Sequence, residues 1–202
     1  MMQQTQARAF ADMRDPPAKG AILSASLKLF VRDGLAETSI RDIAKISGYT
    51  NPALFRHFES KEALAYCLFE RIFLHVRTTL PKIDDAAFAE QLRGTLAAYL
   101  ALLETDIEAA LYLQENIRRF WRLLPEPLRR HSLVNHLRAL VKCGVEQDVI
   151  DRDEDPTMLV AALLGLIGQF ARMCYFREFP GRPPDQLDEL YRLALKITLK
   201  AR

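Results

Sequence analysis

The stretch TSIRDIAKISGYTNPALFRHFESK, residues 38–61, has the pattern of two short helices joined by a tight turn. Thr38 and Ser39 offer side-chain oxygens that can cap a helix N-terminus. Apolar residues then recur on one helical face, at Ile40, Ile43 and Ala44. The glycine at residue 48 ends this first helix, because glycine adopts the left-handed backbone conformation that other residues avoid.

The second short helix begins at Thr50 or Asn51, either of which can cap it, and Pro52 lies in its first turn. Leu54 and Phe58 lie on its buried side. Two short helices at a steep angle around a glycine-containing turn make a helix-turn-helix, whose second helix enters the DNA major groove. The sequence therefore predicts a DNA-reading helix that starts at residue 50 or 51.

Residues 19–66 resemble the DNA-binding domain of the tetracycline-repressor (TetR) family of bacterial transcription regulators. The run LFRHFESKEAL, residues 54–64, is the most specific part of the resemblance. Further matching positions include Ile22, Ala25, Leu29, Phe30, Gly34, Ile40, Ile43, Ala44 and Gly48. The motif covers about a quarter of the chain, and the remainder matches the family only in length and helix pattern.

The resemblance implies a role for each matching residue. The implied DNA-contacting set is Thr38, Ser39, Arg41, Thr50, Asn51, Pro52, Ala53, Phe55, Arg56, His57 and Lys61. Thr38, Ser39, His57 and Lys61 match positions that bond phosphate, and Arg41 matches one that reaches bases or phosphates. An arginine can grip guanine, an asparagine such as Asn51 can pair with adenine, and an alanine such as Ala53 can contact a thymine methyl.

Phe55 departs from the family, which usually has tyrosine at this position with its hydroxyl bonded to phosphate. Loss of that neutral hydrogen bond lowers the expected affinity by about 0.5–1.5 kcal/mol. Phe55 can instead pack against sugar or a thymine methyl, and Arg56 beside it can supply a charged phosphate contact.

The composition favours an all-α protein: the 202 residues are 50% hydrophobic, and strand-favouring runs are scarce. The net charge is only +2, with nine Lys and Arg against six Asp and Glu in residues 1–61. No signal peptide is visible, and the most apolar segment, 158–170, is too short to span a membrane. Three cysteines without a spacing pattern suit a reducing compartment, so we expect a cytoplasmic protein without membrane contact.

We expect three parts: a flexible arm over residues 1–18, the helix-turn-helix domain over 19–66, and a ligand-binding and dimerisation domain over 67–202. Arg8 and Arg14 of the arm could reach the minor groove, as arms in the family sometimes do. Helices are predicted at 19–32, 61–79, 86–104, 107–123, 127–148, 157–178 and 185–200. The acidic loop 151–156 is expected to cap the helix that follows it rather than to bind calcium.

The family resemblance implies a pocket for a small-molecule effector between the helices of the larger domain, but no residue can be carried over. Aromatic and polar side chains among the predicted helices give the candidate ligand set Phe73, Tyr99, Tyr112, Arg118, Trp121, His136, Gln169 and Met173. The resemblance also implies that the last two helices, within roughly 157–200, pack against a second copy. Gly165 and Gly168 support this, since each costs about 1 kcal/mol inside a helix unless another helix approaches closely.

Catalytic and metal sites are not predicted, because the chain has no Gly-rich phosphate loop, no G-x-S-x-G and no CxxC. No cofactor is expected. The function indicated is a homodimeric repressor that a small apolar ligand releases from a pseudo-palindromic operator in double-stranded DNA. Alternatives are a ligand-independent regulator, a thiol-redox regulator using Cys67, Cys143 or Cys174, and a helical enzyme or carrier that only mimics the motif.

Overall fold

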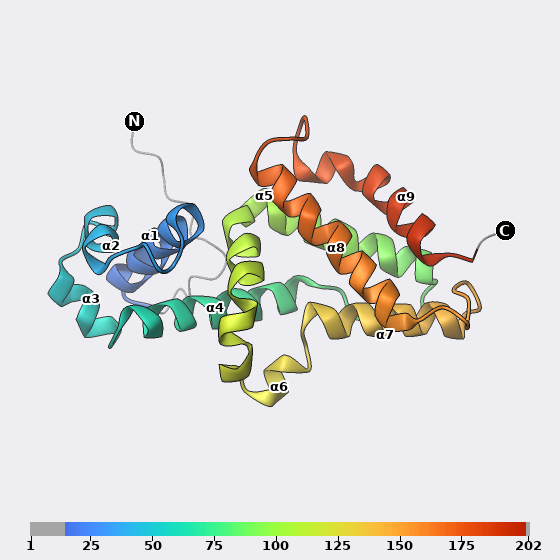
Figure 1. The fold of residues 1–202 in the computed structure, drawn as a ribbon, viewed down its shortest axis with the longest axis horizontal. Coiled ribbons are helices and arrows are strands. Elements are labelled where there is room, and N and C mark those ends of the chain that lie inside the picture. Colours follow the sequence, from blue (N-terminus) through green and yellow to red (C-terminus); the bar gives the residue numbers. More distant parts are fainter. Residues whose placement is uncertain (1–14, 201–202) are drawn as a thin grey trace. The chain divides into compact units, whose positions relative to one another are not determined.

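The computed structural model describes residues 15–200, and the regular elements in that range are all helical (Figure 1). The all-α prediction is confirmed. The predicted arm lies outside the described residues up to residue 14. The elements are α1 (Pro17–Asp33), α2 (Ile40–Ser47), α3 (Asn51–His57), α4 (Lys61–Thr79), α5 (Phe88–Phe120), η1 (Trp121–Leu123), α6 (Glu126–Arg129), α7 (Leu133–Glu146), α8 (Pro156–Tyr175), η2 (Pro183–Gln186) and α9 (Leu187–Thr198).

The described chain forms two compact units, which we call the N-terminal unit (15–75 and 108–124) and the C-terminal unit (76–107 and 125–200). This division differs from the predicted boundary after residue 66. That boundary falls inside α4, which continues to Thr79, and the last part of α5 packs with the N-terminal helices. Both α4 and α5 therefore contribute residues to both units.

The core of the N-terminal unit depends on the last part of α5. The Tyr112 ring stacks on Phe30 with centroids 5.8 Å apart, and its hydroxyl donates to Ala65 O at 2.9 Å. Phe120 packs against Phe69 with centroids 5.3 Å apart. Burial raises the pKa of Tyr112, so its hydroxyl stays protonated and remains a donor.

The start of α1 is fixed to α4 by charged groups. The Asp15 carboxylate accepts from the two terminal guanidinium nitrogens of Arg71, Nη1 and Nη2, and lies 3.2 Å from the Lys19 ammonium. The bonds from Arg71 hold the pKa of Asp15 below its ordinary value. These contacts hold α1 in place. The buried face of α1 in turn packs on α2 and α3, so α1 supports the two helices of the DNA-reading segment.

Two helix boundaries differ from prediction. The helix expected over 127–148 is divided into α6 and α7, because the Ser132 hydroxyl accepts from Asn135 N and starts a new helix. The junction expected at Thr105–Asp106 is a single non-helical residue within α5, Asp106, with φ −155° and ψ 71°. Thr105 does not cap a new helix, since its one hydroxyl proton points back to Ala101 O and Leu102 O, each 3.1 Å from the hydroxyl oxygen.

Helix α8 begins as predicted, with the Asp155 carboxylate accepting from Thr157 N at 2.7 Å. Its length and composition would allow it to cross a membrane, with a mean hydropathy of 1.6 over 18 residues. This is weak evidence for a membrane span, because core helices of soluble proteins pass the same test. Helix α8 packs on α7 and α9, and 33% of that window is buried.

A half-buried histidine joins α7 to α5 in the C-terminal unit. The Thr95 hydroxyl donates its one proton to Gln91 O at 2.9 Å and lies 2.9 Å from His136 Nε2. The hydroxyl must therefore accept from His136, which places the imidazole proton on Nε2. Burial lowers the pKa of His136, so the ring is neutral at pH 7.

Gly144 of α7 packs closely against Ile150, in the loop after this helix, and against Phe88, the first residue of α5. A Cβ at this residue would lie 2.6 Å from Ile150 Cδ1 and 2.9 Å from Phe88 Cδ2, and both of these side chains are fully buried. The closeness requires glycine here, whereas Gly94 of α5 is exposed with no heavy atom within 4 Å of a Cβ.

Gly144→Ala should lower the free energy of unfolding by about 1–3 kcal/mol, because the methyl group overpacks the contact with Ile150 and Phe88. Gly94→Ala is the matched control and should raise it by about 0.5–1 kcal/mol, since glycine is costly in an exposed helix. Urea unfolding of both variants measures the difference. Equal effects of the two substitutions would contradict the close packing at Gly144.

Acid should destabilise the protein between pH 7.5 and 5.5 through His136. The pKa of His136 in the folded protein lies below its unfolded value of about 6.5. As the pH falls, the imidazole is therefore protonated in the unfolded chain before it is protonated in the folded chain. The contribution of His136 to the free energy of unfolding is then complete above about pH 6.5, and it is lost as the pH falls toward the pKa of the folded protein. Urea midpoints at the two pH values should fall less for His136→Gln, which does not titrate; an equal fall in both proteins would refute this role.

Candidate nucleic-acid interface

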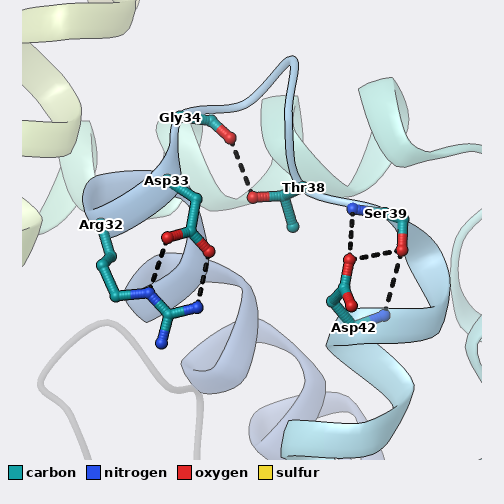
Figure 2. Close-up of polar contacts among 6 residues, drawn as sticks. All are labelled: Arg32, Asp33, Gly34, Thr38, Ser39 and Asp42. Atoms are coloured by element: carbon teal, nitrogen blue, oxygen red, sulfur yellow. Dashed lines mark hydrogen bonds and ion pairs between the residues drawn. The ribbon is translucent and has the colours of Figure 1, made fainter.

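Helix α2 is fixed at its start by a reciprocal pair of side-chain bonds (Figure 2). The Ser39 hydroxyl accepts from Asp42 N at 3.2 Å, and the Asp42 carboxylate accepts from Ser39 N at 3.1 Å. The bond from the Ser39 hydroxyl is the main reason that the pKa of Asp42 lies below its ordinary value. Of the two predicted capping residues, Ser39 is the cap.

The turn and the second helix follow the predicted pattern. Gly48 has φ 76°, in the left-handed region that favours glycine, and ends α2. Thr50 rather than Asn51 caps α3, its hydroxyl accepting from Ala53 N at 3.4 Å. Leu54 is 1% exposed and anchors α3 to the core, while buried Phe58 follows the helix as its C-cap residue.

Most of the predicted DNA-contacting residues lie on the surface of these two helices. Six are exposed, namely Ser39, Arg41, Thr50, Pro52, Phe55 and Arg56. Asn51, Ala53 and His57 are half-buried. Phe55 is 53% exposed, which is high for a phenylalanine and leaves its ring available to a partner.

Thr38 does not fit its predicted role. Its side chain is only 2% exposed, and its hydroxyl donates to Gly34 O at 2.8 Å (Figure 2). Its backbone N–H donates to the same carbonyl oxygen at 3.2 Å. Thr38 therefore closes the loop between α1 and α2, and we correct its assignment from phosphate contact to structural residue.

Lys61, the first residue of α4, is also engaged within the protein. Its ammonium donates to Leu35 O at 2.8 Å, to Ala36 O at 3.1 Å and to Thr38 O at 2.8 Å. An ammonium group has three donors, so all are in use. A phosphate contact from Lys61 stays a prediction, and it would require the release of at least one of these carbonyl groups.

Lys45 and Ile46 are exposed residues of α2 that the predicted set left out. Lys45 follows Arg41 by four residues, so helical spacing alone puts both cations on one exposed face. Ile46 is 53% exposed. The sequence did not indicate this, because an apolar side chain is normally expected in the core. Both lie near the turn that precedes α3.

The predicted ligand residues are divided between the two units. Tyr112 and Tyr99 are core residues whose hydroxyls donate to backbone carbonyls, of Ala65 and Ile167 respectively, and a ligand contact from either stays a prediction. The N-terminal unit also contains buried Phe73, half-buried Trp121 against it and exposed Arg118. His136 bonds Thr95, as described above.

Gln169 and Met173 are the two predicted ligand residues that share a groove. It has a volume of about 180 Å³, lies along α8 and α9, and is otherwise mostly apolar, with Leu166, Phe170, Phe179, Leu190 and Leu193 in its lining. The groove can accept an apolar group, either from a ligand or from another protein surface.

The three cysteines are free thiols. Cys143 is buried and its sulfur accepts from the amides of Gln91 and Gln147 at 3.2 and 3.1 Å. Burial raises the pKa of Cys174, which reduces the reactive thiolate at neutral pH. The surroundings of Cys143 and Cys174 are those of structural cysteines rather than of a redox sensor.

Comparison with known proteins agrees with this geometry. A family model described as bacterial regulatory proteins of the tetR family matches residues 22–66, which include α2, α3 and the turn between them. The chain is also 31% identical over 88 residues to MftR of Mycobacterium tuberculosis, a candidate transcriptional regulator of mycofactocin biosynthesis. That match spans 44% of this chain and 43% of MftR, so less than half of either protein is compared.

Solved structures share the fold over nearly the whole chain. The ketosteroid transcriptional regulator KstR2 of M. tuberculosis has a TM-score of 0.75 at 19% identity, covering 97% of this chain and 100% of its own. FadR from Bacillus subtilis, solved in complex with stearoyl-CoA, has a TM-score of 0.66 at 17% identity, covering 87% and 96%. At these identities the likeness shows the fold alone, while the motif in residues 22–66 carries the relationship.

Together, the capped α2–α3 pair, the family motif over it and the shared helical fold show that residues 22–66 of this chain carry the DNA-binding motif of the tetR family of bacterial regulatory proteins.

Proposed function

We propose that this protein is a homodimeric repressor that binds a pseudo-palindromic operator in double-stranded DNA and leaves it when a small apolar ligand binds. The observation that carries the proposal is the α2–α3 pair. Two short, capped helices bury Ile43 and Leu54 and turn a polar and basic face outward. A groove-inserting helix needs this combination of a fixed backbone and a free outer face.

Base contacts come from three side chains in this proposal. Arg41 grips guanine O6 and N7, Asn51 pairs with adenine, and Ala53 contacts a thymine methyl. Such contacts specify sequence, so they set the affinity for the operator relative to other DNA.

Phosphate contacts come from Ser39, Thr50, Arg56 and His57. Arg56 is exposed and lies beside Phe55, so it supplies the charged contact at the edge of the groove where Phe55 has no hydroxyl. Phosphate contacts position the protein and make its affinity fall with salt.

The dimer forms through α8 and α9 within residues 157–200. One exposed face of α8 has residues at helical spacing, namely Met158, Ala162, Gly165, Gln169 and Arg172. Gly165 is exposed with no heavy atom within 4 Å of a Cβ, so no packing inside the subunit accounts for glycine there. Close approach of the same helix from a second copy does, and two copies then read half-sites about one helical turn apart.

The effector is a small apolar molecule. FadR, which shares this fold, was solved with stearoyl-CoA, whose acyl chain is apolar. The helices of the C-terminal unit offer mainly apolar side chains with few polar groups, which suits such a ligand. The residues that contact it stay a prediction, and the protein acts in the cytoplasm, where its DNA lies.

Arg41→Ala should weaken operator binding by about tenfold or more and leave binding to random DNA nearly unchanged, because a lost bidentate base contact costs about 1–3 kcal/mol. Arg56→Gln should weaken both alike and make the salt slope shallower by about 0.9 per subunit. Fluorescence anisotropy on operator and shuffled DNA at several salt concentrations measures both effects. If both variants lost affinity for the two DNAs equally, this division of roles would be wrong.

Gly165→Glu should convert the dimer to monomers, because a charged side chain enters the centre of the proposed interface. Gly94→Glu is the matched control, since Gly94 is also an exposed helical glycine with open space around it. Sedimentation velocity measures the oligomeric state, and circular dichroism checks that both variants are folded. A dimer that survives Gly165→Glu places the interface elsewhere.

A further inference from the structure

The loop between α1 and α2 depends on α4 for its hydrogen bonds. Thr38 uses its N–H and hydroxyl on Gly34 O, which closes the loop on itself (Figure 2). The carbonyl oxygens of Leu35, Ala36 and Thr38 then all accept from the one ammonium of Lys61, 23 to 26 residues away in the chain. Charge-assisted hydrogen bonds of this kind are stronger than neutral ones.

We propose that Lys61 is a clamp that fixes α2 to the first turn of α4, and so positions the DNA-reading surface, rather than a contact to phosphate. The role in DNA binding rests on the proposed function above. The clamp itself does not, because it is a property of the free N-terminal unit.

The clamp reaches the DNA-reading surface by a short path. Thr38, whose carbonyl Lys61 holds, is next to Ser39, the capping residue of α2. Arg41 follows in the first turn of that helix. On the other side, Lys61 begins a helix that runs without a break to Thr79 and contributes Val76–Thr79 to the C-terminal unit. A movement of α4 is therefore passed to α2 through three hydrogen bonds.

A phosphate contact and a clamp make opposite demands on the same ammonium. The three N–H donors of the ammonium bond loop carbonyl oxygens at 2.8, 3.1 and 2.8 Å. A phosphate bound to Lys61 would therefore leave one of these carbonyl groups without its hydrogen bond. The bonds to Leu35 O and Thr38 O are partly buried, and leaving either carbonyl unpaired is costly, whereas the bond to Ala36 O is exposed; the loop therefore opposes the loss of the two buried bonds. Lys61 therefore stays on the loop when DNA binds.

The test compares Lys61→Met with Lys28→Met, a control at an exposed lysine of α1. Lys61→Met should lower the melting temperature by about 4 °C or more, while the control leaves it unchanged. Well below the melting temperature, where circular dichroism shows the variant folded, operator affinity should fall about tenfold and the salt slope should match that of the wild type. A structural role without positioning would leave the affinity of the folded variant unchanged, and this outcome overturns the proposal.

A phosphate contact predicts the reverse pattern: an unchanged melting temperature and a salt slope shallower by about 0.9 per subunit. That result also overturns the clamp. If Lys61→Met does not fold, a measurement on the wild-type protein decides. Acetylation by a limiting amount of acetic anhydride, followed by mass spectrometry, should modify Lys61 at least about tenfold more slowly than Lys28 in the absence of DNA, because its donors are occupied.

Equal acetylation rates of Lys61 and Lys28 in the free protein would refute the clamp. The failure of the proposed function looks different. In that case the wild-type protein binds no DNA specifically, while melting and acetylation still report whether Lys61 holds the loop.

Discussion

The DNA-reading surface depends on how the backbone groups of two very short helices are satisfied. Helices of eight and seven residues, α2 and α3, have few internal hydrogen bonds and are not stable in isolation. The Ser39–Asp42 pair and the Thr50 hydroxyl supply partners at their first turns, and the left-handed Gly48 ends α2. Ile43 and Leu54 add burial from the inner face. With the backbone fixed in this way, the outward side chains are free to serve recognition alone.

This small unit is completed by chain segments that lie far away in the sequence. Tyr112 and Phe120 of α5 fill the core against Phe30 and Phe69, and Lys61 of α4 supports the loop before α2. Since α4 and α5 both contribute residues to the C-terminal unit, a change there has two covalent routes to the helix-turn-helix. Regulation by a bound ligand needs such routes, because a ligand can act only through a difference that it makes between two states of the protein.

Local signals made much of this structure predictable. Capping residues, a turn glycine and helical spacing act over a few residues, so the sequence predicted α2, α3 and the bounds of α4 closely. Contacts over long separations were not predictable in this way. Thr38 looks like Ser39 in the sequence, yet one is buried against Gly34 O and the other caps α2 on the surface. Tyr112 was a candidate ligand residue because it is an aromatic residue among the predicted helices, but its partners Phe30 and Ala65 lie more than forty residues away in the sequence.

The central claim is that the outer face of α2 and α3 reads a DNA sequence. Selection from random double-stranded DNA by the wild-type protein, with binding of the selected DNA then measured at two salt concentrations, tests it most directly. We expect a palindromic consensus whose affinity for the protein falls steeply between about 50 and 200 mM salt, because several phosphate contacts form. Enrichment of no sequence, or binding that is indifferent to salt, would contradict it.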